Sequence, residues 1–464
     1  MTNSNNITYI DTETTQLHGR VGITEYGEVP DVENFHNQKI LKRIKPNSTT
    51  IPDPVAVAVQ NTNLEDLNAP DRVSEYEGAK FIDYRLKSIK NPTLAFHNNK
   101  FDLMVLNQNA FANLFPPHRT SNKLIFETMD YFRAAIALRP DKFQFYNTQT
   151  GKHSLSLNTI CMELQNEEEK HHADEDCLTT ITSKHLADKI VPEINSLINY
   201  VSIEANRFEL LDSPLLMKPT LSNNHGPSTQ LVSRLSNYDW NNWDMMITIP
   251  DEFDWNGEVS ELVSELKSKV KISVMKTKGI VILFPNNSNT FKKHYANYPD
   301  GKIEHVIKTL RQDDAYIHAK KEELRVKYSK PKERDFSDIY YNEDGFHSAN
   351  DSYISKLFHD SDSKTKNELC NQFEDHRLGM NAKIIMLHNY RDVMTNKDIQ
   401  NVLDYELSEL EKPEASRVTF ESFMKSFDEV NSDPKWSKEV IDNLNEYKAH
   451  VLALKANPKL FLEV

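Results

Sequence analysis

The chain has 464 residues, of which 38% are hydrophobic, and its formal net charge is -14, which argues against a uniformly basic surface that coats nucleic acid. No apolar run reaches the about 18 residues of a membrane-spanning helix, so no membrane partner is expected. The 3 cysteines are too widely spaced for a disulfide framework or a zinc site. We therefore expect a protein of roughly two to four domains in a reducing, cytoplasmic setting.

The first predicted strand, residues 7–14, runs into two carboxylates. Side chains of a strand alternate between its faces, so Asp11 and Glu13 point the same way. Two carboxylates on one face repel each other unless a cation, usually a divalent metal, lies between them. An isolated Asp-x-Glu is more often only a polar strand end. A metal site therefore requires further acids and a base from the rest of the chain.

Predicted strands and helices alternate after this strand. Strands are predicted over residues 39–45 and 93–97, and helices over residues 77–89 and 100–106. Residues 54–59 fit a short helix that starts with proline, although their valines suit a strand equally well. Asp102 lies in the first turn of its helix. The helix dipole favours an acid there, so this position alone does not require a functional role for Asp102.

The next stretch leads to a second cluster of acids. A strand is predicted over 124–131, a helix over 132–138 that Pro140 stops, and another helix over 154–164. A cluster with two histidines and three acids, residues 171–180, follows, and we expect it to continue as a long amphipathic helix towards Ile198.

Helix geometry constrains how this second cluster can converge. Residues five apart on a helix differ by roughly 140° in direction, so His171 and Asp176 cannot share a face inside one helix. They can converge if His171 lies on the lead-in loop and Asp176 in the first or second turn. Asp174 would then lie near the N-cap. A histidine on a loop is usually only solvated, so its acidic neighbours carry the functional interpretation.

Three segments together resemble the motifs of the DEDDh exonuclease superfamily. They are Asp11-Thr12-Glu13, Asn98-Asn99-Lys100-Phe101-Asp102 and His171-His172-Ala173-Asp174-Glu175-Asp176. The last matches the His-x-Ala-x-x-Asp pattern. Residues 132–140, 216–219, 270–272 and 340–346 are similar to further segments of the bacterial exodeoxyribonuclease I family, so the likeness covers nearly the whole chain. Residues 14–16 and 96–98 differ from that family's pattern.

The resemblance implies an α/β fold in three parts. These are a ribonuclease-H-like mixed-sheet exonuclease domain over 1–198, a small SH3-like β-barrel domain with a basic segment over 199–335, and an α-helical C-terminal domain over 336–464. Together they would close around single-stranded DNA. The implied reaction is 3′→5′ hydrolysis of that DNA to 5′-mononucleotides, in repair, recombination or replication.

The resemblance also implies a catalytic set, composed of Asp11, Glu13, Asp102, Asp176 and His171. Carboxylates are hard ligands suited to two Mg²⁺ ions, for which Mn²⁺ can substitute. Two such ions about 4 Å apart can activate water and stabilise the leaving 3′ oxygen. A histidine with an ordinary pKa of about 6.5 can take the proton of the water. His172 is a rival base, but the five-residue offset to Asp176 favours His171.

The rest of the chain supplies a basic stretch between shorter elements. Strands are predicted at 244–249 and 278–283 and helices at 303–311 and 319–328, and residues 351–392 and 415–454 are expected to be predominantly helical. Residues 267–334 hold 17 Lys and Arg against 7 Asp and Glu. The tyrosines among these cations are Tyr295, Tyr298, Tyr316 and Tyr328. Cations with rings suit a single-strand channel, although the rings fit a core equally well.

The binding residues that we expect fall into two groups. The DNA contacts predicted are Thr14, Asn98, Lys100, Arg139, Lys276 and Lys278. Members of the resembling family bind the acidic C-terminal tail of single-stranded-DNA-binding protein, and we match Lys308 and Arg311 to that role. We expect the protein to be a monomer.

Two other functions remain open at this point. An RNA-trimming or proofreading member of the same superfamily would share the site, but such proteins are usually smaller or lack the two extra domains. A catalytically inactive DNA-binding scaffold predicts loss of the acids, and none of the five positions is lost. The chemistry of the residues decides neither the polarity of digestion nor DNA over RNA.

Overall fold

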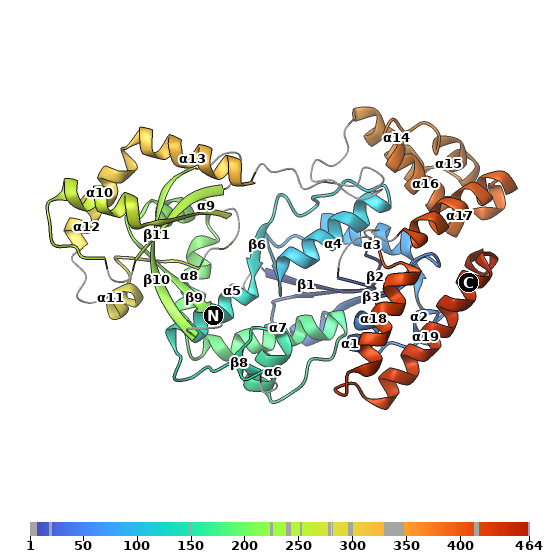
Figure 1. Cartoon of the computed structure of the whole chain (residues 1–464), viewed down its shortest axis with the longest axis horizontal. Helices are drawn as coiled ribbons and strands as arrows, with labels where there is room; N and C mark the ends of the chain where they lie inside the picture. The colour runs from blue at the N-terminus through green and yellow to red at the C-terminus, as the bar shows by residue number, and fades with distance from the viewer. Residues whose placement is uncertain are drawn as a thin grey trace.

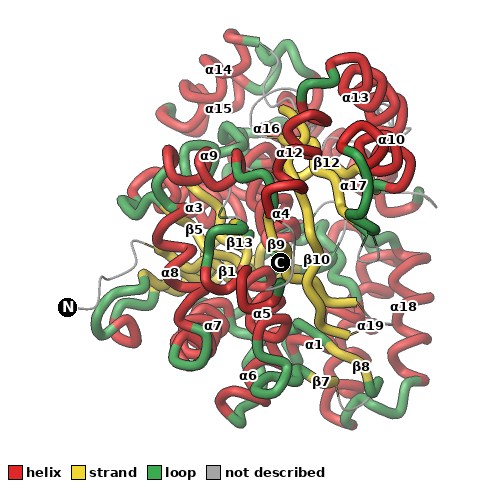
Figure 2. Tube along the Cα trace, turned by 90° about the vertical axis from the view of Figure 1, so that its left-hand side faces the viewer, coloured by secondary structure: helices red, strands yellow, loops and turns green. Residues whose placement is uncertain are grey.

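A computed structural model gives the fold for most of the chain. It describes residues 7–17, 21–147, 150–222, 226–237, 243–250, 253–276, 280, 282–295, 300–328, 348–412 and 417–462. A central sheet lies between a second sheet with its own helices at one end and the C-terminal helices at the other (Figure 1). Strands lie towards the middle and helices around them (Figure 2). Within the described residues, no helix combines the length and apolarity needed to cross a bilayer.

The central sheet is mixed, as the sequence predicts. Its order is β4-β3-β2-β1-β5-β6, and β1 pairs antiparallel with β2 and parallel with β5. The strands are β1 Ile7–Thr14, β2 Ile23–Pro30, β3 Ile40–Lys45, β4 Val73–Ser74, β5 Thr93–Phe96 and β6 Leu124–Glu127. Because β1 lies inside the sheet, the acids near its end lie at the middle of the molecule.

Helices and one hairpin surround this sheet. They are η1 Phe35–Asn37, α1 Pro54–Gln60, α2 Leu64–Leu67, α3 Glu75–Ser88, α4 Asn99–Ala112, α5 Thr128–Leu138, hairpin β7 Tyr146–Asn147 and β8 Lys152–His153, α6 Leu157–Gln165, α7 Ala173–Asp188 and α8 Pro192–Val201. Residues 54–60 are helical, since the Asp53 side chain accepts the N–H of Val55 and caps the helix.

Two element boundaries differ from the prediction. The strand expected over 124–131 ends at Glu127, because the Glu127 side chain accepts the N–H of Met129 and starts α5 at the next residue. The single helix expected to continue towards Ile198 stops at Asp188. A new helix, α8, begins at Pro192, whose ring and missing N–H are tolerated only in a first turn.

The middle of the chain forms a second, antiparallel sheet in the order β12-β11-β10-β9-β13. Its elements are α9 Glu204–Asp212, β9 Leu216–Ser222, β10 Gly226–Asn237, β11 Trp243–Ile249, α10 Val259–Lys269, β12 Lys271–Lys276, β13 Phe284–Pro285, α11 Asn289–His294, α12 Asp300–Arg311 and α13 Asp314–Tyr328. This sheet is the small β domain that we expect. The strand predicted at 278–283 is wrong for the residues described there, and pairing begins only at Phe284.

The C-terminal part is helical, as expected. Its elements are α14 Ala349–Asp360, α15 Ser363–Leu369, α16 His376–Asn389, η2 Arg391–Val393, α17 Asn396–Glu411, α18 Phe420–Ser432, α19 Lys438–Ala456 and η3 Pro458–Leu462. Val57 of α1 shares one hydrophobic core with Leu403 and Phe423. Leu114, after α4, shares another with Phe358. The C-terminal helices are thereby packed directly onto the domain that carries the acids.

Candidate active site

Strand β1 presents its two acids on one side. Asp11 and Glu13 are the partly exposed residues of an otherwise buried strand, which confirms the predicted alternation. Thr12 between them faces away, and its Oγ1 donates to Asp102 Oδ1 at 2.8 Å. Asp102 lies in the first turn of α4 and is only 2% exposed. One hydrogen bond therefore ties the first acidic segment to the second.

The third segment converges on the first in the way that helix geometry predicts. His171 lies on the lead-in to α7 with a left-handed backbone (φ 52°), while Asp176 lies in the first turn of that helix. One ligand atom from each of Glu13, His171 and Asp176 lies within 4.8 Å of the other two. Acids from β1 and α7 thus meet a histidine that comes from outside the helix.

A glycine permits this approach. Gly27 of β2 lies opposite Asp11 in the sheet register. A Cβ placed on Gly27 would lie 2.2 Å from the carbonyl carbon of Ala173 and 2.5 Å from the nitrogen of Asp174. Only a residue without a side chain lets the start of α7 press against β2, and this contact brings Asp176 to the acids of β1.

Burial and the charges of nearby acids raise the pKa of all four acids. The pKa of Asp11 lies well above its ordinary value because of burial and then the charge of Asp102. Burial and the charge of Asp176 raise the pKa of Glu13 to about 8. Burial is also the main reason that the pKa of Asp102 rises to about 7 and that of Asp176 to about 8. Among the described residues, no lysine or arginine forms an ion pair with any of the four. A cation is what such a cluster lacks.

The two adjacent histidines have different surroundings. His172 is the N-cap residue of α7, and its Nδ1 lies 3.3 Å from Glu25 Oε2 while its side chain is 61% exposed. Glu25 also accepts the N–H of Ala173 at 3.4 Å, so it holds the start of the helix. The structure therefore brings His171 to the acids and pairs His172 with a different carboxylate.

A cleft of about 590 Å³ leads away from the acids. It is lined by Asp11, His97, Asn98, Met129, Arg133, His153, Ser154, Leu155, Ser156, Leu157, Glu169 and Leu221. It therefore runs past α5 to the end of β9, where the two sheets approach each other. Arg133, His153 and Glu169 were not predicted from the sequence, and only Glu169, two residues before His171, carried a local signal.

Of the predicted DNA contacts, Asn98 lies on the cleft. Asn98 is exposed and has a left-handed backbone (φ 72°) at the start of α4. Glu127, also missed from the sequence, accepts the N–H of Asn98 at 2.9 Å and that of Asn99 at 2.7 Å. Lys100 is exposed beside them, and Arg139 is partly exposed at the end of α5.

The other predicted DNA contacts lie elsewhere or cannot be placed. Thr14 is 5% exposed and its Oγ1 donates to the carbonyl of Gln16 at 3.1 Å, so it faces the interior and not the cleft. Lys276 ends β12 with its side chain outside the description, and Lys278 lies outside the described residues. Tyr295 and Tyr316 are partly buried against the core, which favours the core alternative for both. Tyr298 and the side chain of Tyr328 lie outside the description.

The two residues predicted to contact a partner protein differ in how far they are already engaged by this chain. Lys308 is exposed on α12. Arg311 donates to the carbonyls of Arg234 at 2.7 Å, Asp212 at 3.0 Å and Ser213 at 2.8 Å, and to Ser233 Oγ at 3.1 Å. The guanidinium of Arg311 thus joins α12, α9 and β10, and this geometry does not fit a role in binding a partner's acidic tail.

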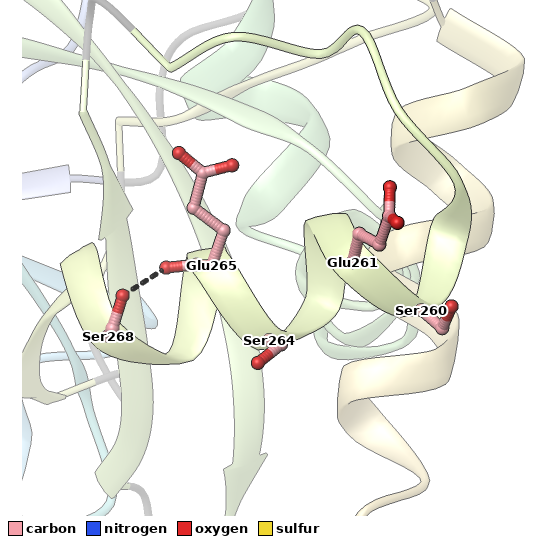
Figure 3. A pocket seen from close by; sticks show the side chains of 5 residues that line it. All are labelled: Ser260, Glu261, Ser264, Glu265 and Ser268. Atoms are coloured by element: carbon pink, nitrogen blue, oxygen red, sulfur yellow. Dashed lines mark hydrogen bonds between the residues drawn. The ribbon is translucent and has the colours of Figure 1, made fainter.

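A second, shallow hollow lies on α10 (Figure 3). It is lined by Ser260, Glu261, Ser264, Glu265 and Ser268, and Ser268 Oγ donates to the carbonyl of Glu265 at 2.7 Å. All five residues come from one helix, so no acids from separate elements converge there as they do beside β1. The hollow therefore does not compete with the cleft beside β1 as a candidate active site.

Comparisons with known proteins agree with this site. Residues 8–183 match the RNase_T family, described as exonuclease. No curated protein matches the sequence. The region that contains all five converging positions thus forms an exonuclease domain, and the protein is a nuclease.

The fold of the whole chain is that of exonuclease I. Exonuclease I from Methylocaldum szegediense is 18% identical with a TM-score of 0.74, covering 96% of this chain and 99% of that chain. The zinc-bound E. coli ExoI–ssDNA complex is 18% identical with a TM-score of 0.74 and coverages of 97% and 99%. An ExoI/SSB-Ct complex is 16% identical with a TM-score of 0.70 and coverages of 96% and 98%.

Proposed function

We propose that this nuclease is a 3′→5′ exodeoxyribonuclease that degrades single-stranded DNA to 5′-mononucleotides with the help of divalent cations. The observation that carries the proposal is the convergence of Glu13, His171 and Asp176 within 4.8 Å. The ssDNA and zinc bound to the E. coli relative support this choice of substrate and a divalent cation. Repair, recombination and replication all generate such strands.

The residues present fit a pair of Mg²⁺ ions. Carboxylate oxygens are the ligands that Mg²⁺ and Mn²⁺ prefer, and the cluster offers them from Asp11, Glu13, Asp102 and Asp176. The raised pKa values of these acids mean that the metal-free site holds protons where cations would otherwise balance the charge. When bound, such ions would lower the pKa of the attacking water and stabilise the leaving oxygen.

The remaining catalytic work falls to residues of the chain. We assign to His171 the role of general base, since it lies beside Glu13 and Asp176 and can take the proton of the attacking water. Thr12 fixes Asp102 through its hydrogen bond, so the acids of β1 and α4 keep their spacing. Asp11, whose pKa is raised by the charges of all three other acids, would hold a cation together with them.

The cleft supplies a path for the 3′ end of the strand. Arg133 and His153 line it and offer donors to phosphate oxygens. Asn98 lies at its acidic end with its backbone held by Glu127. We propose that these residues, with Lys100 and Arg139 nearby, hold the terminal nucleotides.

Digestion of end-labelled strands tests the proposal. Two single-stranded DNA oligonucleotides, labelled at opposite ends, and a matched RNA would be incubated with Mg²⁺ or with EDTA. We expect Mg²⁺-dependent shortening from the 3′ end, weaker on RNA and lost in Asp11→Asn. Asp141→Asn is a matched control, because that side chain is 65% exposed and outside the site. Faster loss of RNA would indicate the RNA-trimming alternative, and binding without cleavage would indicate a scaffold.

We also propose that the chain binds the acidic C-terminal tail of single-stranded-DNA-binding protein, as the ExoI/SSB-Ct complex suggests. Exposed Lys308 is the contact that we retain for this role. Fluorescence anisotropy with a labelled acidic peptide would compare wild type with Lys308→Ala. Unchanged affinity in that variant would remove Lys308 from the interface.

A further inference from the structure

The segment between α6 and α7 contains an acid to which the proposed mechanism gives no role. Glu169 lies two residues before His171 and lines the cleft together with Asp11. Its side chain is 21% exposed, whereas Glu167 and Glu168 beside it are exposed. One of three consecutive acids is therefore turned towards the site while its two neighbours face solvent.

The backbone and side chain of Glu169 are fixed by one partner. Its N–H donates to Asn158 Oδ1 at 3.1 Å, and its Oε2 accepts the N–H of Asn158 at 3.1 Å. Asn158 belongs to the first turn of α6, where free N–H groups favour an anion. This reciprocal pair holds the carboxylate in one orientation without help from the acids of the site.

The other oxygen of Glu169 faces His171. Oε1 lies 3.7 Å from Nδ1 of His171. His171 has a left-handed backbone (φ 52°) at this point of the loop. The separation is longer than a hydrogen bond, so the carboxylate and the ring face each other and a direct bond requires them to move closer.

We propose that Glu169 is a positioning residue that holds Nδ1–H of His171 and so leaves Nε2 free to take the proton of the attacking water. This inference rests on the proposed function. A carboxylate that accepts one ring N–H fixes both the tautomer and the direction of the imidazole. Glu169 is assigned to act through His171 because its free oxygen, Oε1, faces Nδ1 of that ring, while its Oε2 is already held by Asn158.

A variant series with two readouts tests the assignment. Glu169→Gln keeps the size of the side chain, Glu169→Asp keeps its charge, and Glu168→Gln is the matched control on an exposed neighbour. At saturating Mg²⁺ and DNA we expect kcat to fall about 10–100-fold in Glu169→Gln, with KM unchanged and partial rescue in Glu169→Asp. In a His171→Ala background Glu169→Gln should cause no further loss.

The second readout needs neither metal nor DNA. Long-range ¹H–¹⁵N spectra of the metal-free protein report the tautomer of His171, identified by its absence in His171→Ala. We expect the Nδ1–H tautomer in wild type and in Glu168→Gln, and a mixture in Glu169→Gln. A wild-type kcat in Glu169→Gln, an equal loss in the His171→Ala background, or an unchanged tautomer would overturn the inference.

The outcomes separate this inference from the proposed function. If wild type showed no Mg²⁺-dependent digestion, the proposed function would fail while the spectra still tested the contact between Glu169 and His171. If wild type digested DNA and the Glu169 variants behaved like wild type in both readouts, only the inference would fail.

Discussion

At the residue scale, the site holds several acids close together, and a bound cation would reduce the repulsion between their charges. Asp11, Glu13, Asp102 and Asp176 are brought together by three different elements, and burial, together with the charges of nearby acids, raises the pKa of each. In the folded metal-free protein, these acids therefore hold protons near neutral pH. The unfolded chain releases the same protons near its ordinary carboxyl pKa of about 4.

The stability of the metal-free protein should accordingly fall as pH rises. The contribution of these protonated acids to the free energy of unfolding is fully present below about pH 4. It is lost as pH rises through about 7 for Asp102 and about 8 for Glu13 and Asp176. In EDTA we expect Tm to drop by at least about 3 °C from pH 6 to pH 9, and Mg²⁺ to reduce the drop. Thermal scans of wild type and Asp176→Asn check this, since the variant should give a shallower slope. Equal slopes would contradict it.

The histidine pair offers a second prediction, with an internal control. His171 lies with Glu13 and Asp176, whereas His172 faces Glu25. If His171 is the base, His171→Ala should lower kcat by about 10²–10⁴-fold, whereas His172→Ala should change it little. Steady-state rates at saturating Mg²⁺ on one DNA oligonucleotide measure both. A larger loss in His172→Ala would reverse the assignment.

At the scale of elements, the site depends on how closely α7 approaches the sheet. Gly27 on β2 leaves no space for a side chain beside Ala173. Glu25, two residues earlier on the same strand, accepts the N–H of Ala173. One strand thus supplies both the contact surface and the anchor for the helix that carries Asp176.

Gly27→Ala should therefore damage the site and the fold together. The added Cβ must displace the start of α7, which we expect to cost about 1–3 kcal/mol of the free energy of unfolding. Since a small misplacement of catalytic groups is costly, kcat should fall by about 10-fold or more. Gly301→Ala on α12 is the control, because its Cβ would meet nothing within 4 Å. Denaturant titration and kcat measure the two effects, and a wild-type result for Gly27→Ala would refute the close contact.

Local sequence patterns predicted the strands and helices that position the site. They did not predict the contacts between segments that lie far apart in the sequence. The alternation of β1 fixed the common side of Asp11 and Glu13, and helix periodicity placed His171 on a loop. The close contact at Gly27 was not predictable, since it joins β2 to a helix far along the chain. The contacts of Arg311 within the chain were not predictable for the same reason, because they lie on two other elements.

At the scale of the whole molecule, the C-terminal helices contact the segment that follows the first acids. The N–H of Val418 donates to Gln16 Oε1 at 3.2 Å, and Ser426 Oγ donates to Asp53 Oδ1 at 2.9 Å. The N–H of Asp53 in turn donates to the carbonyl of Thr15 at 2.8 Å. Hydrogen bonds from α18 and the residues just before it therefore connect to the segment that follows β1. A disturbance of the helical part can reach the site along this short path.

A second contact joins α14 to the exonuclease domain through a partly buried histidine, His359. Burial lowers the pKa of His359 to about 4, so the ring is neutral. Its Nε2 lies 3.0 Å from the carbonyl of Leu114, which can only accept, so Nε2 carries the proton and Nδ1 accepts from the Tyr76 hydroxyl at 2.9 Å. The ring also stacks on Phe115 with centroids 3.9 Å apart.

Removing this ring should loosen the C-terminal helices without altering the cleavage chemistry. In His359→Ala the hydroxyl of Tyr76 loses its acceptor, which costs about 1–3 kcal/mol when such a group stays buried, whereas the carbonyl of Leu114 keeps the Ser355 hydroxyl as a donor. We expect faster amide hydrogen exchange in α14 than in α5, with an unchanged cleavage rate on a short oligonucleotide. Tyr353→Ala on the same helix is the control, since that side chain is 60% exposed. Equal exchange in both variants would mean that α14 is held by its hydrophobic contacts alone.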